Sequence, residues 1–432
     1  MHQNSATTTQ PKQNINRYVL DNGITVVSAE NMAADIVASR IFFKNAGATG
    51  EAREAAGLAH LLSATITKGC GELSSLEIAE KVESVGASLS ADAASDYFLV
   101  SLKTVSADFA EMLQLTAEML RSPTFPETEV ELEKNLSLQS IRSQQEQPFN
   151  VAFNQLRQAM YPHHPYGFSI LGTEETVSGL NRADLQQHHQ TYFRPDNMIV
   201  SLSGRLTQAD AIKLVEHTFG DWQAPNTPLS TPKLAELTSQ PSVHTTPQDT
   251  QQSIIILGYL TPSVSEKDFF ALKLLNTYLG NGLSSRLFVE LREKRGLAYD
   301  VSAFYPTRRD KSNFVVYIGT APGNTATSIE GLHTEVKRLG ETKLTAEELQ
   351  AAKNKLLGQY ALGKQSNSEI AQIFGWYETI GLGIEFDREF QEAIANITPE
   401  IAQEVACRYF SESPYLSIVG PEAAIQGHSL PK

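Results

Sequence analysis

The chain has 432 residues, of which 41% are apolar and 19% are charged, and this composition is ordinary for a folded protein. It excludes collagen-like, wholly disordered and coiled-coil architectures, and the length allows two or three domains. The formal net charge of −14 argues against nucleic acid or an anionic membrane surface as a partner.

Residues 1–15 are polar, with neither the apolar core of a secretory signal nor an Arg-rich amphipathic pattern, and we expect a flexible tail there. The longest apolar stretch, Ser253–Leu260, is far shorter than the roughly 20 residues that span a membrane as a helix. Cys70 and Cys407 form neither a disulfide framework nor a Cys-based zinc motif. Together these features predict a cytoplasmic protein that does not enter a membrane.

A Pro-rich segment with weak periodicity, residues 223–252, is predicted to be a linker between two similar halves. The strand pattern after Asp96 recurs at Asn313, and the acidic helix start Phe125–Asn135 recurs 219 positions later as Leu344–Asn354. The segments that end at Phe193 and Phe410 also correspond, and each precedes a short strand. A nearly constant offset over four ordered elements indicates a duplication.

The predicted domains are therefore residues 16–222 and 253–432. Each half combines alternating strand patterns with long amphipathic helices that are grouped in the sequence. We expect an α+β fold in which two homologous domains each have a mostly antiparallel sheet with helices packed on one face.

The segment GLAHLLSATITKG, Gly57–Gly69, is predicted to be helical and contains His60. It resembles the zinc-binding helix of the insulinase/pitrilysin superfamily, the inverzincins, whose signature is H-x-x-E-H. In that alignment His60 occupies the first ligand position, Ser63 replaces the general-base Glu, and Ala64 replaces the second His. The resemblance places the third ligand of the family, a Glu, at Ser140 in the stretch that ends at Pro148.

A catalytic zinc needs three protein ligands and a water, together with a base that takes the proton of that water. One imidazole supplies neither, so we expect no metal in this chain, and His60 is interpreted as a packed or hydrogen-bonded helix histidine. The adjacent pairs His163–His164 and His188–His189 lack the i, i+4 spacing of a helical metal site.

In the second half, Ser284–Val301 is predicted to be a helix with a basic last turn, followed by Gly296 as C-cap and a strand from about Ala298. Arg292 and Tyr299 in this segment are consistent with a helix end and a core tyrosine. They also match the family setting L-R-E-x-x-G-L-x-Y, and the resemblance implies that both reach a zinc site. A guanidinium and a phenol can donate hydrogen bonds to the oxyanion that forms during peptide hydrolysis.

Arg292 and Tyr299 match the family pattern while the zinc-site positions do not. The resemblance to the heterodimeric bacterial branch of the family implies that such a chain is the catalytically inactive subunit of a two-subunit peptidase. The resemblance implies that a homologous partner subunit carries the zinc and that peptides are the substrates. One alternative is a structural subunit similar to the core subunits of respiratory complexes. Another is a peptide-binding holdase without a proteolytic role.

Overall fold

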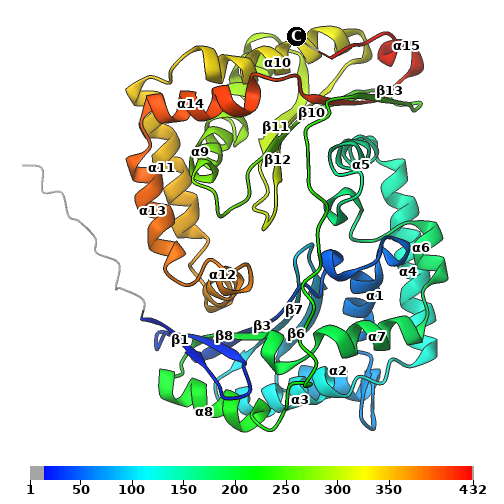
Figure 1. The fold of residues 1–432 in the computed structure, drawn as a ribbon, viewed down its shortest axis with the longest axis vertical. Coiled ribbons are helices and arrows are strands. Elements are labelled where there is room, and N and C mark those ends of the chain that lie inside the picture. Colours follow the sequence, from blue (N-terminus) through cyan, green and yellow to red (C-terminus); the bar gives the residue numbers. More distant parts are fainter. Residues whose placement is uncertain (1–13, 431–432) are drawn as a thin grey trace, which may run out of the picture.

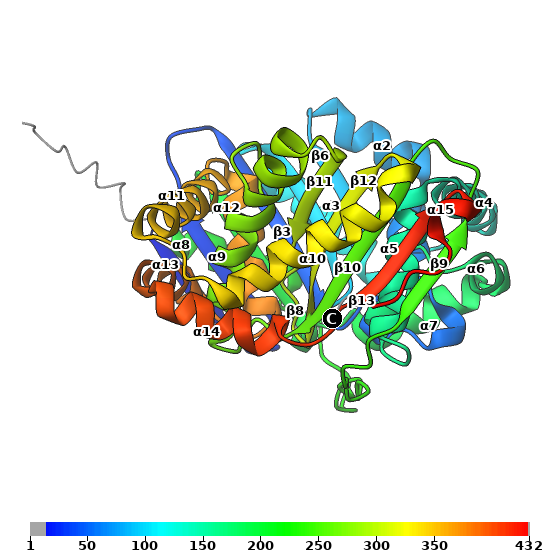
Figure 2. The same ribbon diagram turned by 90° about the horizontal axis from the view of Figure 1, so that it is seen from above.

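The computed structural model of the protein describes residues 14–430. The chain forms two halves that face one another, and each half has a sheet with helices on its outer side (Figure 1; Figure 2). This arrangement confirms the predicted α+β class with two similar domains. Within the described residues, no helix combines the length and the hydropathy needed to cross a membrane.

The first-half sheet has six strands in the order β1-β2-β8-β3-β7-β6, and β2 and β8 are its one parallel pair among the described strands. Its strands are β1 (Ile15–Val19), β2 (Thr25–Glu30), β3 (Ile36–Lys44), β6 (Ser88–Ala93), β7 (Tyr97–Val105) and β8 (Met198–Gly204). A separate hairpin joins β4 (Gly69–Cys70) and β5 (Leu73–Ser74).

The second-half sheet has the order β11-β12-β10-β13-β9. Its strands are β9 (Val243–Pro247), β10 (Ser253–Thr261), β11 (Ala298–Phe304), β12 (Ser312–Thr320) and β13 (Tyr415–Gly420). Taken in reverse, this order repeats the first sheet without β1, and the parallel pair β13–β9 corresponds to β8–β2. The duplication inferred from the sequence is therefore present in the strand topology.

The helices follow the same repeat, and the acidic segments predicted to begin helices do so at Glu127 and Ala346. The first half has η1 (Ala48–Gly50), η2 (Arg53–Ala55), α1 (Leu58–Thr65), α2 (Ser75–Ser84), α3 (Phe109–Arg121), α4 (Glu127–Glu146), α5 (Pro148–Met160), η3 (Pro165–Gly167), α6 (Glu174–Gly179), α7 (Arg182–Tyr192), η4 (Pro195–Asn197) and α8 (Gln208–Phe219). The second half has α9 (Asp268–Gly280), η5 (Phe288–Lys294), η6 (Pro322–Asn324), α10 (Thr325–Glu341), α11 (Ala346–Leu362), α12 (Asn367–Thr379), α13 (Phe386–Asn396), α14 (Pro399–Phe410) and α15 (Glu422–Ile425).

Each half contributes one helix to the sheet of the other half. Helix α5 packs on β9, β10 and β13, while α12 packs on β2, β3 and β8. Both helices lie on the inner sides of the sheets, between the two halves (Figure 1). The apolar core accordingly crosses the division, since Phe374 of α12 belongs to the same buried cluster as Phe42, and Leu156 of α5 to the same cluster as Ile256.

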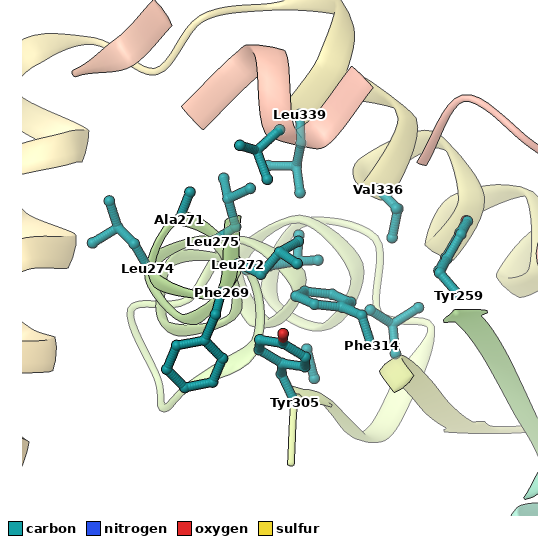
Figure 3. Close-up of a cluster of buried hydrophobic side chains, with 14 of the residues drawn as sticks. Tyr259, Phe269, Ala271, Leu272, Leu274, Leu275, Tyr305, Phe314, Val336 and Leu339 are labelled. Atoms are coloured by element: carbon teal, nitrogen blue, oxygen red, sulfur yellow. The ribbon is translucent and has the colours of Figure 1, made fainter. Parts of the chain in front are cut away.

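The outer core of the second half is built around α9, whose residues are apolar on nearly every side. Leu272 and Leu275 are fully buried in this core, and Phe269 lies beside Tyr305 with a ring separation of 5.6 Å (Figure 3). A helix that is apolar all round is stable only when other elements cover it, and α10, α11, α13 and α14 contact α9.

The predicted linker, residues 223–252, contains strand β9, which the sequence reasoning did not predict. Pro247 is the last residue of β9, which lies at the edge of the sheet. Proline is tolerated there because an edge strand does not need a backbone N–H on its outer side for pairing. The predicted tail, residues 1–15, lies largely outside the described residues, and Ile15 already belongs to β1. Residues 16–222 and 253–432 remain the proposed domains, although α5 and α12 each pack on the sheet of the other domain.

Candidate functional site

Helix α1 positions the residues that resemble a zinc site. It begins after Gly57, whose φ of +99° suits glycine, and a β-carbon there would lie 2.7 Å from the Leu171 carbonyl oxygen. The carboxylate of Glu51 accepts hydrogen bonds from the backbone N–H groups of Gly57, at 3.1 Å, and Ala59, at 2.6 Å. Burial raises the pKa of Glu51 to about 7, and these two hydrogen bonds oppose that rise.

His60 lies half-buried on α1, near β6 and α4. Burial lowers the pKa of this imidazole, while the carboxylates of Glu133 and Asp92 act in the opposite direction. Its position matches the helix predicted from the sequence.

The two residues that follow on α1 offer no ligand. The Ser63 hydroxyl donates to the backbone carbonyl of His60 at 2.7 Å, and Ala64 presents a methyl group. This hydroxyl is therefore satisfied by its own helix, and neither side chain can take a proton from a water at neutral pH.

Ser140 lies on α4, is exposed, and donates its hydroxyl to the Leu136 carbonyl oxygen at 3.0 Å. Across residues 14–430 there is no group of three or more His, Cys, Asp or Glu side chains arranged to hold a metal. One imidazole, two hydroxyls bonded to helix carbonyls and one methyl group do not fit the zinc that the resemblance implies.

Glu133 is a residue that the sequence reasoning missed. It lies on α4 seven positions before Ser140, acts electrostatically on His60, and forms an ion pair with Lys68 at 2.8 Å. The buried residues Val130, Ser137 and Ile141 share this side of α4, and their helical spacing was the signal that could have placed Glu133 toward α1.

Of the paired histidines, His164, His188 and His189 are buried and hydrogen-bonded within the fold, whereas His163 is exposed. His164 is fully buried with its Nε2 atom 3.3 Å from a carboxylate oxygen of Asp310. The rings of His188 and His189 bond to the carbonyl oxygens of Ala46 and Leu120, at 3.0 and 2.8 Å. Burial lowers the pKa of His188 to about 4, so this ring is neutral at physiological pH.

Arg292 lies near the end of η5, a π-helical turn, and is exposed to solvent. Its guanidinium lies over the ring of Phe288, 5.0 Å from the centroid, and this is its one side-chain interaction within the described residues. The turn ends at Lys294 with Arg295 as its C-cap, and the predicted cap residue, Gly296, follows one position later with φ +61°.

Tyr299 follows on β11, the edge strand of the second sheet. The pairing of β11 with β12 shifts between Ala298 and Asp300, so Tyr299 is the extra residue of a bulge. Its side chain is 57% exposed, and within residues 14–430 its hydroxyl has no hydrogen-bond partner. Tyr299 at the bulge and Arg292 in the turn can therefore both donate hydrogen bonds to a molecule outside the chain.

The structure does not bring all the predicted site residues together. His60, Ser63 and Ala64 share α1, which packs on the α4 helix of Ser140. Among the described residues, no hydrogen bond, ion pair or ring contact joins Arg292 or Tyr299 to any of them. The two groups lie near β6 and β11, equivalent edge strands in opposite halves (Figure 1).

Two family models match consecutive parts of the chain. The model described as Insulinase (Peptidase family M16) matches residues 25–174, and the model described as Peptidase M16 inactive domain matches residues 179–356. The chain belongs to the insulinase family, M16. His60, Ser63, Ala64 and Ser140 all lie within the first match, and Arg292 and Tyr299 lie within the second.

Two relatives described as zinc proteases share almost the full length of the chain. An uncharacterized zinc protease of Bacillus subtilis, YmxG, is 28% identical over 418 residues, which are 94% of this chain and 98% of that protein. An uncharacterized zinc protease of Mycobacterium leprae, ML0855, is 27% identical over 417 residues, 94% of this chain and 92% of that protein.

Solved structures confirm the M16 fold. A peptidase M16 inactive domain from Pseudomonas fluorescens superimposes with a TM-score of 0.87 at 23% identity, covering 94% of this chain and 98% of that one. A protease from Helicobacter pylori gives a TM-score of 0.89 at 23% identity and covers 95% and 100%.

Proposed function

We propose that this chain is the catalytically inactive subunit of a two-subunit zinc peptidase. A homologous partner would hold the zinc, which activates the attacking water, and this chain would supply Arg292 and Tyr299. The observation that carries the proposal is that Arg292 and Tyr299 are both exposed and, within residues 14–430, have no carboxylate and no hydrogen-bond partner, respectively. In the same part of the chain, helix α1 has no set of metal ligands.

The chemistry of the pair suits peptide hydrolysis. When water attacks a peptide carbonyl, negative charge develops on the carbonyl oxygen, and donors that are already in place stabilise that charge. The guanidinium of Arg292 is held by Phe288 at the end of a helix, and Tyr299 is held by the edge strand. Each can therefore donate to the oxyanion or to the adjacent peptide backbone of a substrate bound to the partner.

The proposal is tested by reconstitution. The purified chain is mixed with an M16 chain of the same organism that carries an intact H-x-x-E-H, and hydrolysis of an unfolded peptide substrate is followed. We expect activity only when both chains are present. We expect Arg292→Ala or Tyr299→Phe to lower the kcat/KM of the mixture by about 10²–10³-fold, as for the loss of one oxyanion donor.

Lys294→Ala is the matched control, because Lys294 lies in the same exposed turn but pairs with Glu290. It should leave the activity of the mixture unchanged. Full activity of the mixture with Arg292→Ala and with Tyr299→Phe would instead favour a structural role for this chain.

A further inference from the structure

A shallow cavity of about 420 Å³, widely open to solvent, lies where the exchanged helix α12 meets the inner face of the first-half sheet. Its walls come from both halves of the chain: Arg40 on β3 and Tyr97 on β7, and Ser368, Gln372, Ile373 and Trp376 on α12. Figure 1 shows that α12 lies on the side of this sheet that faces the second half. The volume is in the range of pockets that bind small ligands.

Arg40 brings a positive charge into this cavity without a matching carboxylate. Its Nη1 atom donates to the carbonyl oxygen of Ser39 at 3.0 Å, and among the described residues no acidic side chain lies within ion-pair distance. Its other N–H groups are not among the fully buried atoms that lack a partner, so they keep contact with solvent, and Arg40 is one of the residues that line the cavity. Burial lowers the pKa of Arg40 and Asp92 opposes this effect, but a guanidinium keeps its proton at neutral pH.

The one acidic residue among those that line the cavity, Glu369, is already engaged. Its carboxylate accepts hydrogen bonds from the backbone N–H and the hydroxyl of Ser366, both at 2.9 Å, in the capping box of α12. These two bonds lower the pKa of Glu369, which is the expected effect of hydrogen bonds to a carboxylate. Glu369 is therefore ionised at neutral pH, and its two hydrogen bonds hold the carboxylate at the start of α12.

The remaining wall groups are apolar surfaces and hydrogen-bond donors. The ring of Tyr97 packs edge-on against Phe42 at 5.3 Å, and Ile373 and Trp376 are partly exposed. Within residues 14–430, the Tyr97 hydroxyl, the Gln372 amide and the Trp376 indole N–H have no hydrogen-bond partner. An unpaired guanidinium among apolar walls and free donors favours a ligand with an anion attached to an apolar group.

We propose that this cavity binds the carboxylate of a peptide together with an adjacent apolar side chain. The Arg40 guanidinium pairs with the carboxylate, and Tyr97, Ile373 and Trp376 contact the apolar side chain. The carboxylate comes from the C-terminus of the peptide or from an acidic side chain. This binding needs neither zinc nor a partner chain, so it is independent of the role proposed for Arg292 and Tyr299.

The test uses the isolated full chain and fluorescence anisotropy. Three fluorescein-labelled pentapeptides are compared: one ends in leucine-phenylalanine with a free carboxylate, one is its C-terminal amide, and one is an amide with aspartate in place of the leucine. We expect saturable binding of the free acid that is at least about tenfold tighter than that of the first amide. Equally tight binding of the aspartate peptide would identify a side-chain carboxylate as a source and would support the same chemistry.

Two variants locate the site. Arg40→Gln removes the charge, and Ser368→Asp places a competing carboxylate in the cavity at the start of α12, where an acidic residue is compatible with the helix. Each should weaken binding of the free acid by about tenfold or more. Lys103→Gln is the control, because Lys103 is an exposed cation on β7 outside the cavity, and its loss should change nothing.

Thermal unfolding of each variant shows whether it is folded, and Ser368→Asp keeps the test valid if Arg40→Gln unfolds the chain. Equal affinity for the free acid and for both amides, no saturable binding of any peptide, or unchanged binding by folded Arg40→Gln and Ser368→Asp would overturn the proposal.

Discussion

Gly375 of α12 lies directly against the ring of Phe42 on β3, so a β-carbon at Gly375 would overlap with Cε2 of that ring and lie 2.7 Å from Cβ of Ser201. Both neighbours are fully buried and belong to the first-half sheet. The exchanged helix therefore depends on a position without a side chain. The reciprocal contact is similar, since a β-carbon at Gly258 of β10 would lie 2.8 Å from the sulfur of Met160 on α5.

We expect Gly375→Ala to lower the free energy of unfolding by about 1–3 kcal/mol, because the extra methyl group forces Phe42 or the helix to move in a close-packed core. Urea denaturation followed by circular dichroism measures this change. Gly358→Ala is the control, since Gly358 lies inside α11 with no neighbouring atom within 4 Å of the place that a β-carbon would take, and it should stabilise the chain by up to about 1 kcal/mol. Equal stability of the two variants would contradict the close contact.

Glu51 should make the stability of the chain depend on pH. Its folded-state pKa of about 7 lies above the ordinary value of 4.5, so the folded chain holds a proton that the unfolded chain releases. The stability contributed by the neutral form is fully present below about pH 4.5 and is lost as the pH rises to about 7. The loss amounts to at most about 3 kcal/mol, at 1.36 kcal/mol for each unit of pKa.

Glu51→Gln isolates this effect, because the amide resembles the neutral acid and cannot ionise. Relative to this variant, the unfolding free energy of the natural chain should fall between pH 5 and pH 8, as measured by urea denaturation at each pH. Other titrating groups are common to both proteins and cancel in the difference. Two parallel curves would show that Glu51 ionises in the folded chain at its ordinary pKa.

Adding the ligand types that the family motif has at positions 64 and 140 should create a zinc site. We expect the natural chain to bind no stoichiometric zinc, and the double variant Ala64→His with Ser140→Glu to bind about one equivalent, because three ligands then surround the His60 position. Competition with a chromophoric chelator measures the affinity. Ala64→His with Gln139→Glu is the matched control: it has the same number of candidate ligands, but its carboxylate is turned about 100° around α4. Equal zinc affinity of the two double variants would show that Ser140 is not the ligand position.

Much of the fold follows from sequence periodicity. The recurring strand and helix patterns predicted the duplication, since two copies with the same order of elements fold into the same topology. The exchange of α5 and α12 was not predicted, because an amphipathic pattern shows that a helix face is buried but not which sheet covers it. Strand β9 was missed for a similar reason: its ladder is provided by β13, which lies far later in the chain.

The candidate site, too, was predicted from the sequence only in part. Spacing placed His60, Ser63 and Ala64 on one helix and Arg292 and Tyr299 at a helix end and a strand start, and the structure has them there. Glu51 and Arg40 gave no sequence signal, because the burial of Glu51 and the missing partner of Arg40 arise from segments that are distant along the chain. Whether Arg292 and Tyr299 act on a substrate stays a prediction.

The traded helices also have an evolutionary consequence. Because each copy of the duplicated unit contributes a helix to the other, a gene for one copy alone would encode a sheet with an exposed apolar face. Deleting or separating the copies would therefore expose a large apolar surface, so each half is needed for the fold of the other, whatever chemistry it carries.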